Sequence, residues 1–178
     1  MLSNAEKIEI NEADKYGRSP FYAACSKGQI EVVKYLLNDE RTNINQSYRL
    51  PDWTPFWCAC ERGHLEIVKL LLNDKRIDVK KAAKNGRTPI HITCFRGHIE
   101  ILENILASGR EINLNAKEKD GETAIDIARV DKLTKESEEV FQKRREMVPL
   151  LESFERNPNE TRTKLRIKLG LTGKTFII

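Results

Sequence analysis

Cysteine and histidine give this chain its clearest chemical potential. Thiols can form disulfides or hold zinc, and a histidine can ligate a metal or act as a general base. The candidates are Cys25, Cys58, Cys60, Cys94, His64, His91 and His98. The pair Cys58-x-Cys60 lacks a second ligand pair at zinc-finger spacing, so we expect no metal site.

Equivalent positions along the chain argue against the remaining chemistries. Cys25, Cys60 and Cys94 recur at intervals of about 35 residues, in one column of an internal repeat. Neighbouring helical units pack about 8–10 Å apart, which exceeds the Cα separation of about 7 Å that a disulfide can bridge. We therefore expect reduced, buried thiols. His64 and His98 follow equivalent glycines, which indicates a structural role for them too.

The sequence also lacks the common motifs of enzymes. It contains no G-x-S-x-G and no H-E-x-x-H. The string GLTGKT at Gly170–Thr175 ends as a P-loop does, but the first glycine of that motif is missing. We expect no catalytic residue, no cofactor and no small-molecule substrate.

An internal repeat must position all of these residues. One segment starts at Ser19 with SPFYAACSKGQIEVVKYLLND. It returns at Thr54 as TPFWCACERGHLEIVKLLLND and at Thr88 as TPIHITCFRGHIEILENILAS, and a shorter copy, TAIDIARV, starts at Thr123. A period of about 35 residues indicates stacked supersecondary units rather than one globular core. Because such a stack is built as a surface, binding is the first functional hypothesis.

Each unit is predicted to contain two short helices. Ser19, Thr54 or Thr88 precedes a proline, and this pair suits the cap and the first position of a helix. A glycine about eight residues later ends the first helix. The second helix follows with apolar residues at helical spacing, as in Ile30 and Val33. Helices this short are unstable alone in water, so the units must stack.

These motifs make the sequence resemble the ankyrin-repeat family over about Ile10 to Phe154. The motifs are G-x-[ST]-P at Gly17–Pro20 and Gly86–Pro89, G-H-x-E-[IV] at Gly63–Ile67 and Gly97–Ile101, and V-K-x-L-L at Val33–Leu37 and Val68–Leu72. The resemblance implies an all-α fold, an α-solenoid with β-hairpin-like loops between helix pairs. It also implies that partners bind the loop tips and the concave face of the first helices.

The expected organisation is a repeat domain followed by a cap. Residues 1–154 carry the ankyrin repeats, with clear units near 14–45, 49–80 and 83–114 and a modified fourth near 118–154. Residues 155–178 form a basic C-terminal helix and tail. In the fourth unit, Pro149 removes a backbone donor, so we expect a kink or a fresh helix start near Glu146.

Three departures from the family pattern carry expectations of their own. The family's histidine after T-P-x remains only as His91, so its hydrogen bond to threonine is in doubt elsewhere. Asp52 stands where the other loop tips have glycine, and aspartate tolerates positive φ better than most residues. The loops after the first two second helices lack the usual glycine, so those helix ends should be built differently.

The C-terminal segment has its own helix signals. Asn157 can cap, Pro158 suits the first position, and Gly170 can end the helix. One hypothesis is a capping helix that covers the last repeat and leaves its charges in solvent, which we favour. The alternative is recruitment to an anionic membrane, RNA or an acidic protein. Its anion-binding residues would be Arg162, Lys164, Arg166 and Lys168.

The candidate partner-binding residues follow from the family's variable positions. They lie at the loop tips and just before the glycine that ends each first helix: Tyr16, Arg18, Trp53, Arg62, Arg87, Phe95 and Arg96. Aromatic and arginine side chains dominate interface hot spots because they bury a large area and keep a polar handle. For Trp53 and Phe95, packing against the next loop stays open as an alternative, and for Trp57 and Tyr22 packing is favoured.

Composition narrows the class of partner and the cellular location of the protein. The net charge of +4 is too small to indicate a nucleic-acid or membrane-surface protein by itself. The N-terminus has no apolar signal segment, and no apolar run is long enough to span a bilayer, so we expect a cytoplasmic or nuclear protein. We expect a protein partner and a monomer, with weak self-association through the N-terminal edge left open.

Family resemblance also makes Asn11 and Asn115 possible hydroxylation sites, although turn hydrogen bonding explains them more simply.

Overall fold

The computed structural model describes residues 9–48, 52–130 and 137–172, and in these ranges the chain is helical with no strand. The P-loop-like string at Gly170–Thr175 lies partly outside the described residues, since only its first three residues are included. The helices are α1 (Pro20–Lys27), α2 (Ile30–Asn38), α3 (Pro55–Arg62), α4 (Leu65–Leu72), α5 (Pro89–Arg96), α6 (Ile99–Ala107), α7 (Ala124–Arg129), α8 (Glu138–Arg156) and α9 (Pro158–Lys168).

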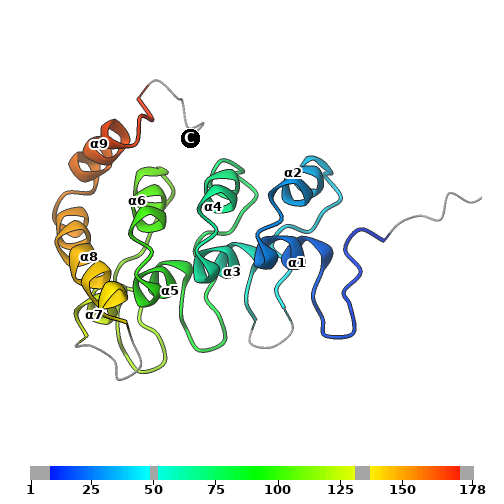
Figure 1. The fold of residues 1–178 in the computed structure, drawn as a ribbon, viewed down its shortest axis with the longest axis horizontal. Coiled ribbons are helices and arrows are strands. Elements are labelled where there is room, and N and C mark those ends of the chain that lie inside the picture. Colours follow the sequence, from blue (N-terminus) through cyan, green and yellow to red (C-terminus); the bar gives the residue numbers. More distant parts are fainter. Residues whose placement is uncertain (1–8, 49–51, 131–136, 173–178) are drawn as a thin grey trace, which may run out of the picture.

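The helices form a two-row stack, as expected of an α-solenoid. Helices α1, α3, α5 and α7 make one row, and α2, α4 and α6 make the second (Figure 1). The loops project away from the second row, while α8 and α9 close the C-terminal end (Figure 1). Each first helix packs on the first helix of the next unit, so no unit forms a hydrophobic core by itself.

The starts of the first helices follow the sequence prediction. Ser19 and Thr54 accept hydrogen bonds from the backbone N–H groups of Tyr22 and Trp57, which satisfies donors that the helix leaves free. At Thr88 the family's histidine bond is present, since His91 Nδ1 lies 2.6 Å from the threonine hydroxyl oxygen. The repeat positions where another residue replaces this histidine differ. At Thr123, for example, the Asp126 carboxylate accepts hydrogen bonds from the threonine N–H and hydroxyl groups.

The end of each first helix depends on a glycine and on the next unit. Gly28 and Gly63 have φ of 72° and 75°, in the left-handed region. A Cβ on Gly28 would lie 2.9 Å from the His64 ring, and one on Gly63 would lie 2.8 Å from the His98 ring. Those rings contact carbonyls of the preceding helix, with His64 Nε2 lying 3.2 Å from the Ser26 oxygen. The predicted structural role of both histidines is confirmed.

Where the loops after α2 and α4 lack the usual glycine, arginines from the next unit pair the carbonyls at the helix ends. Arg76 donates to the Leu37 carbonyl at 2.8 Å, across to the preceding unit. Arg110 donates in the same way to the Asp74 carbonyl at 3.0 Å, just beyond the end of α4. Guanidinium groups from the next unit therefore satisfy carbonyls that the first and second units leave unpaired.

The loop tips are hairpin-like turns closed by backbone hydrogen bonds. The N–H of Asp14 donates to the Arg18 carbonyl at 3.0 Å, and the N–H of Ala83 donates to that of Arg87 at 2.9 Å. In the second tip Asp52 has φ of 67° and is the one non-glycine residue with positive φ among the described residues. The prediction that aspartate would replace glycine in this turn is confirmed.

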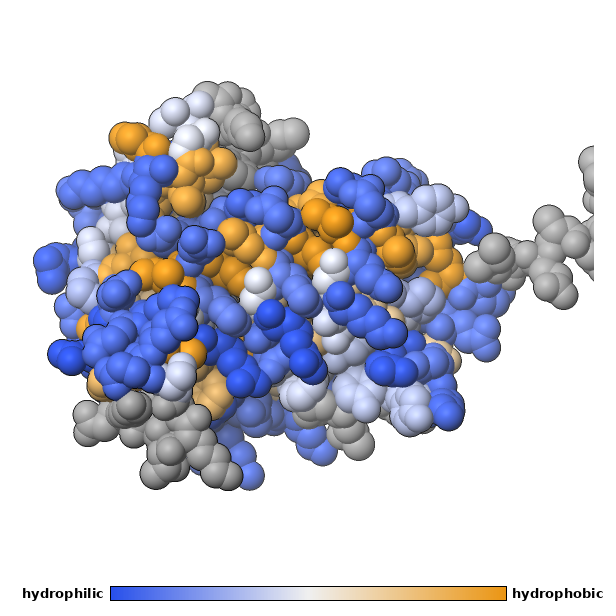
Figure 2. All heavy atoms as spheres, in the orientation of Figure 1, coloured by the Kyte–Doolittle hydropathy of each residue, from blue (hydrophilic) through white to orange (hydrophobic). Residues whose placement is uncertain are grey.

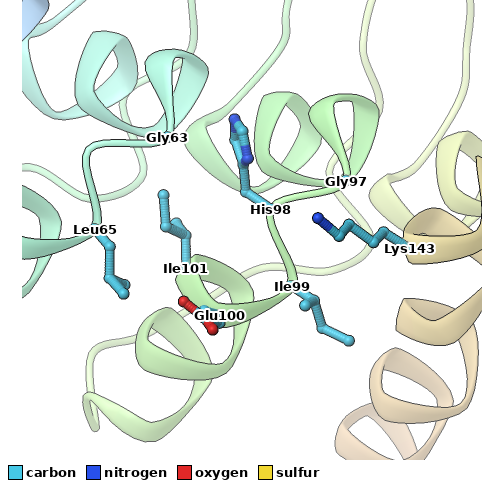
Figure 3. A pocket seen from close by; sticks show the side chains of 8 residues that line it. All are labelled: Gly63, Leu65, Gly97, His98, Ile99, Glu100, Ile101 and Lys143. Atoms are coloured by element: carbon cyan, nitrogen blue, oxygen red, sulfur yellow. The ribbon is translucent and has the colours of Figure 1, made fainter. Parts of the chain in front are cut away.

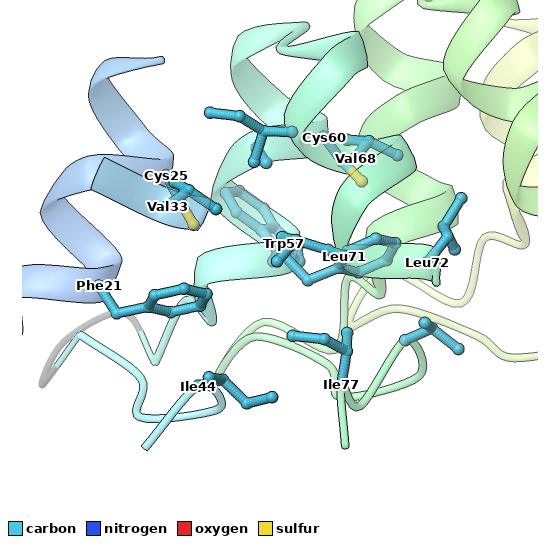
Figure 4. Packing of buried hydrophobic residues seen from close by; sticks show 14 of the residues in the cluster. Phe21, Cys25, Val33, Ile44, Trp57, Cys60, Val68, Leu71, Leu72 and Ile77 are labelled. Carbon is cyan, nitrogen blue, oxygen red and sulfur yellow. The ribbon is translucent and has the colours of Figure 1, made fainter. Parts of the chain in front are cut away.

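The core runs continuously along the stack. Buried side chains of the first three units form one cluster, part of which Figure 4 shows around Trp57, Cys60 and Leu71. A second cluster joins α5 and α6 to α7, α8 and α9, and the half-buried ring of Phe95 packs against both. The cap therefore shares a buried cluster with the third and fourth units.

The modified fourth unit corrects one prediction. Helix α8 runs unbroken through Pro149. Of the two alternatives, a kink or a fresh helix start near Glu146, the fresh start is therefore wrong and the kink stays a prediction. Pro149 is exposed, while Met147 and Leu151 are buried. The carbonyl that loses its donor belongs to Arg145, which is also exposed, so the missing bond lies on the solvent side of the helix. Buried Arg144 donates to the Ile127 carbonyl at 2.6 Å, at the end of α7.

We predict that Gly63→Ala lowers the free energy of unfolding by about 2–4 kcal/mol, because a left-handed alanine is strained and its Cβ meets the His98 ring. Gly121→Ala is the matched control. Gly121 has φ of 86° but nothing within 4 Å of its Cβ position, so the change should cost only the backbone strain of about 1–2 kcal/mol. Equal losses in urea denaturation of the two variants would contradict the proposed glycine–histidine contact.

Candidate functional site

A band of aromatic and arginine side chains crosses the first three units on the first helices and loops. We call it the aromatic–arginine band. Its members form three groups of contacting side chains and come from α1, α3, α5 and the loops before α3 and α5. They are Tyr22, Tyr48, Trp53, Trp57, Glu61, Arg62, Arg87, Phe95 and Arg96.

Two tryptophans form the centre of the band. The rings of Trp53 and Trp57 stack with centroids 4.7 Å apart and planes 8° apart. Trp57 is buried and donates from Nε1 to the Arg87 carbonyl at 3.0 Å, which ties the second unit to the third loop. Trp53 is only half-buried. The rigid inner ring therefore supports an outer ring that a partner could contact.

Phe95 lies between two guanidinium groups. Arg87 lies over its ring with Cζ 4.9 Å from the centroid, and Arg96 lies 5.7 Å away. Arg87 also approaches the buried carboxylate of Glu118, with Nε 3.6 Å from Oε2. Cation–π contacts of this kind hold the three side chains in place before any partner arrives.

Glu61 joins the arginines of two units. Its carboxylate contacts Arg62 Nε at 2.8 Å and also pairs with Arg96 from the next unit. The Glu61 side chain is 11% exposed, against 57% for Arg62 and 46% for Arg96. One carboxylate thus neutralises part of the charge of two guanidinium groups, which keep their outward N–H groups in solvent.

The first unit contributes aromatic rings in two places. Tyr22 and Tyr48 stack with centroids 5.5 Å apart, and burial raises the pKa of Tyr22. Tyr16 is 55% exposed and lies under Arg18, whose Cζ is 4.8 Å from the ring centroid. The Arg18 guanidinium hydrogen-bonds Asp14 and lowers the pKa of that carboxyl to about 2. Tyr16 and Arg18 therefore form a cluster of their own on the first loop.

The predicted binding residues thus fall into two groups. Trp53, Arg62, Arg87, Phe95 and Arg96 come together in the band. Sequence reasoning did not select Glu61, which directly precedes Arg62. Its signal was an acid one position before a repeated basic residue.

Three of the four candidate anion-binding residues are engaged within the fold. Arg162 donates to the Leu106 carbonyl at 3.4 Å and Arg166 donates to the Ala107 carbonyl at 3.0 Å, at the end of α6. Lys168 pairs with Glu103, whose side chain is 8% exposed. Only Lys164 pairs with an acid in solvent, Glu160 on the same helix. These contacts favour the capping role over anion binding.

The cysteines and histidines do not converge on a reactive centre. All four thiols are free and buried, and burial raises the pKa of both Cys60 and Cys94 to about 12. In the part of the chain that the structure describes, no group of three histidine, cysteine or acidic side chains could hold a metal ion. A cavity of about 200 Å³ lies beside the turns at Gly63 and Gly97, between the starts of α4 and α6 and Lys143 of α8 (Figure 3). Its lining mixes glycine and aliphatic groups with His98, Glu100 and Lys143.

The loop asparagines join neighbouring loops. Asn11 donates to the Arg41 carbonyl at 2.7 Å and accepts from the Asn43 N–H at 2.6 Å. Asn45, which sequence reasoning did not single out, makes the same pair of bonds one unit later. This supports the simpler interpretation of Asn11. Asn115 is exposed on the last such loop, and its modification stays a hypothesis.

The remaining surface is mostly hydrophilic. On the face shown in Figure 2, a hydrophobic band follows the boundary between the two helix rows, with hydrophilic side chains above and below it. At the N-terminal end, Val32 and Tyr35 on α2 are 44% and 75% exposed, whereas the equivalent Ile67 is buried by the preceding unit. No described helix has both the length and the apolar character needed to cross a membrane.

Comparison with known proteins finds one family. A family model described as ankyrin repeats, in three copies, matches residues 1–83 and 43–116. No curated protein matches the chain.

We predict that Lys168→Met lowers the free energy of unfolding by about 1–3 kcal/mol, because it leaves the buried Glu103 carboxylate without its cation. Lys164→Met is the matched control on the same helix. Its partner Glu160 is 55% exposed, so the loss should stay within about 0.5 kcal/mol. Chemical denaturation of both variants checks this, and equal losses would argue that α9 does not act as a cap.

We also predict that the protein loses stability as the pH falls below about 6.5. Burial lowers the pKa of His91 and His98 in the folded protein. Between the ordinary histidine value and the lower folded one, the unfolded chain binds more protons, so stability is complete above that window and declines within it. Urea denaturation between about pH 7.5 and pH 5 measures the slope. The His91→Gln/His98→Gln variant should show a flatter profile, and an unchanged slope would contradict the assignment.

Proposed function

The chain belongs to the ankyrin-repeat family, and we propose that its aromatic–arginine band binds another protein, so that the molecule acts as an adaptor or inhibitor. Ankyrin repeats generally mediate protein–protein interaction. The observation that carries the proposal is the exposed layer of the band: Trp53, Phe95, Arg62 and Arg96 stand partly in solvent on a buried support.

The band has the composition of an interface hot spot. Tryptophan and arginine carry a large share of binding energy in protein interfaces, because they combine area with a hydrogen-bonding end. Here the side chains already pack on one another, as in the Trp53–Trp57 stack and the Arg87–Phe95 contact. Less conformational entropy is then lost when a partner binds. Tyr16 and Arg18 on the first loop could extend the contact surface.

The same contacts argue for binding rather than catalysis. The titratable groups of the band are arginines, tyrosines and one glutamate held between two arginines, and these offer no nucleophile beside a base. The free, buried thiols suit the reducing cytoplasm or nucleus, where we place the protein in this proposal.

The test is affinity capture with quantitative comparison of variants. Immobilised full-length protein and its Trp53→Ala/Phe95→Ala variant are incubated with lysate, and the captured proteins are identified. Each candidate is then purified and measured by calorimetry. Truncating a hot-spot residue costs about 1–4 kcal/mol of binding free energy, so the double variant should lose at least about tenfold in affinity.

Tyr35→Ala/Ile167→Ala is the matched control. Both residues are large, apolar and highly exposed, at 75% and 63%, and both belong to helices outside the band. This variant should bind the partner as the wild type does. If it loses the partner while the band variant keeps it, the binding surface lies elsewhere and the proposal fails.

A further inference from the structure

The first helices of the first three units each end on a basic residue. Lys27 ends α1, Arg62 ends α3 and Arg96 ends α5, each directly before the left-handed glycine. All three are exposed. Because α1 packs on α3 and α3 on α5, the three cations form a row along the stack.

The row is held in register from one unit to the next. Arg96 reaches back to the Glu61 carboxylate, which also contacts Arg62 at 2.8 Å. In the first unit Ser26 takes the position of Glu61, so the end of α1 has no equivalent acid. Among the residues that the structure describes, Lys27 has no ion-pair partner. Three cations and one acid leave the row with an excess of positive charge.

The spacing of the row matches an extended chain. Neighbouring packed helices lie about 8–10 Å apart. A polyproline II segment is extended, has three residues per turn and rises about 3.1 Å per residue, so side chains three residues apart lie on one face and are separated by about 9 Å. A partner segment in this conformation, lying along the stack, would therefore bring every third side chain opposite one cation. A helical segment, with its rise of about 1.5 Å per residue, would need a spacing of about seven residues.

We propose that the row Lys27–Arg62–Arg96 binds an extended acidic segment of the partner protein, with carboxylates three residues apart. Guanidinium groups present fork-like donors that suit carboxylates. Apolar residues between the acids would contact the half-buried Phe95, whose ring centroid lies 5.7 Å from Cζ of Arg96 in the row, and Trp53 would extend the contact surface toward the start of α3. Glu61 occupies, within the free protein, part of the donor set that the partner's carboxylates would use. This inference rests on the proposed protein-binding function and specifies its partner.

Selection from a random displayed-peptide library tests both claims separately. The full chain and its Trp53→Ala/Phe95→Ala variant are used as baits. We expect the wild type to enrich peptides with acids at positions i, i+3 and i+6, and the variant to lose them. Peptides that depend on Trp53 and Phe95 but show no such spacing would overturn this inference and leave the function standing. If no peptide depends on these two residues, both proposals fall.

Charge variants then test the row itself with the best labelled peptide, by fluorescence anisotropy. Arg62→Gln and Lys27→Gln should each weaken binding about threefold, since a partly exposed ion pair contributes modestly to affinity. Glu61→Gln should tighten binding, because it removes the competing carboxylate. Lys164→Gln, on the capping helix, should leave the affinity unchanged. Weaker binding by Glu61→Gln, or an equal loss with Lys164→Gln, would overturn the assignment.

Discussion

In this stack, backbone carbonyls at the helix ends find no hydrogen-bond donor within their own unit. A segment later in the chain supplies the donor. For the first helices of units one and two the donors are imidazoles, as His64 shows at the Ser26 carbonyl. For the second helices they are guanidinium groups, as Arg76 shows at the Leu37 carbonyl. A buried carbonyl without a donor costs about 1–3 kcal/mol, and helices of two turns cannot offset that cost alone. The fold therefore depends on contacts between units more than on any single unit.

This dependence has a direction along the chain. Donors come from the C-terminal neighbour, so the last unit needs a substitute while the first needs none. Helices α8 and α9 provide that substitute: Arg144 serves the end of α7, and Arg166 serves the end of α6. The N-terminal edge instead exposes the apolar side chains of Val32 and Tyr35. The basic charge of the C-terminal helix, which suggested an anionic partner from sequence, is thus largely explained by the carbonyls and the buried acid that it meets.

Residues that recur in every repeat had roles that could be predicted from the sequence. Residues that join two units at a single place did not. Caps, glycines and the apolar column recur with one period, so their roles could be inferred from spacing, as could the αL turn at Asp52. Arg110 and Arg144 gave no signal, because their partners are backbone carbonyls of distant residues and every residue type has one. Pro149 was misjudged because its cost depends on whether the freed carbonyl faces solvent, which a periodic pattern does not show. In the band, residue types located the surface, but the link through Glu61 required coordinates.

The structural rule and the binding chemistry coincide at the ends of the first helices. The C-terminus of a helix carries partial negative charge, so a basic residue there is stabilised by about 0.3–1 kcal/mol before it contacts anything else. Lys27, Arg62 and Arg96 occupy this position in successive units. The glycine that follows lets the next unit approach closely, and that approach sets the separation between one cation and the next. A regular cationic row therefore arises from the same contacts that hold the units together. Its spacing is fixed by helix packing, and a change in one unit's packing would shift its cation relative to its neighbours.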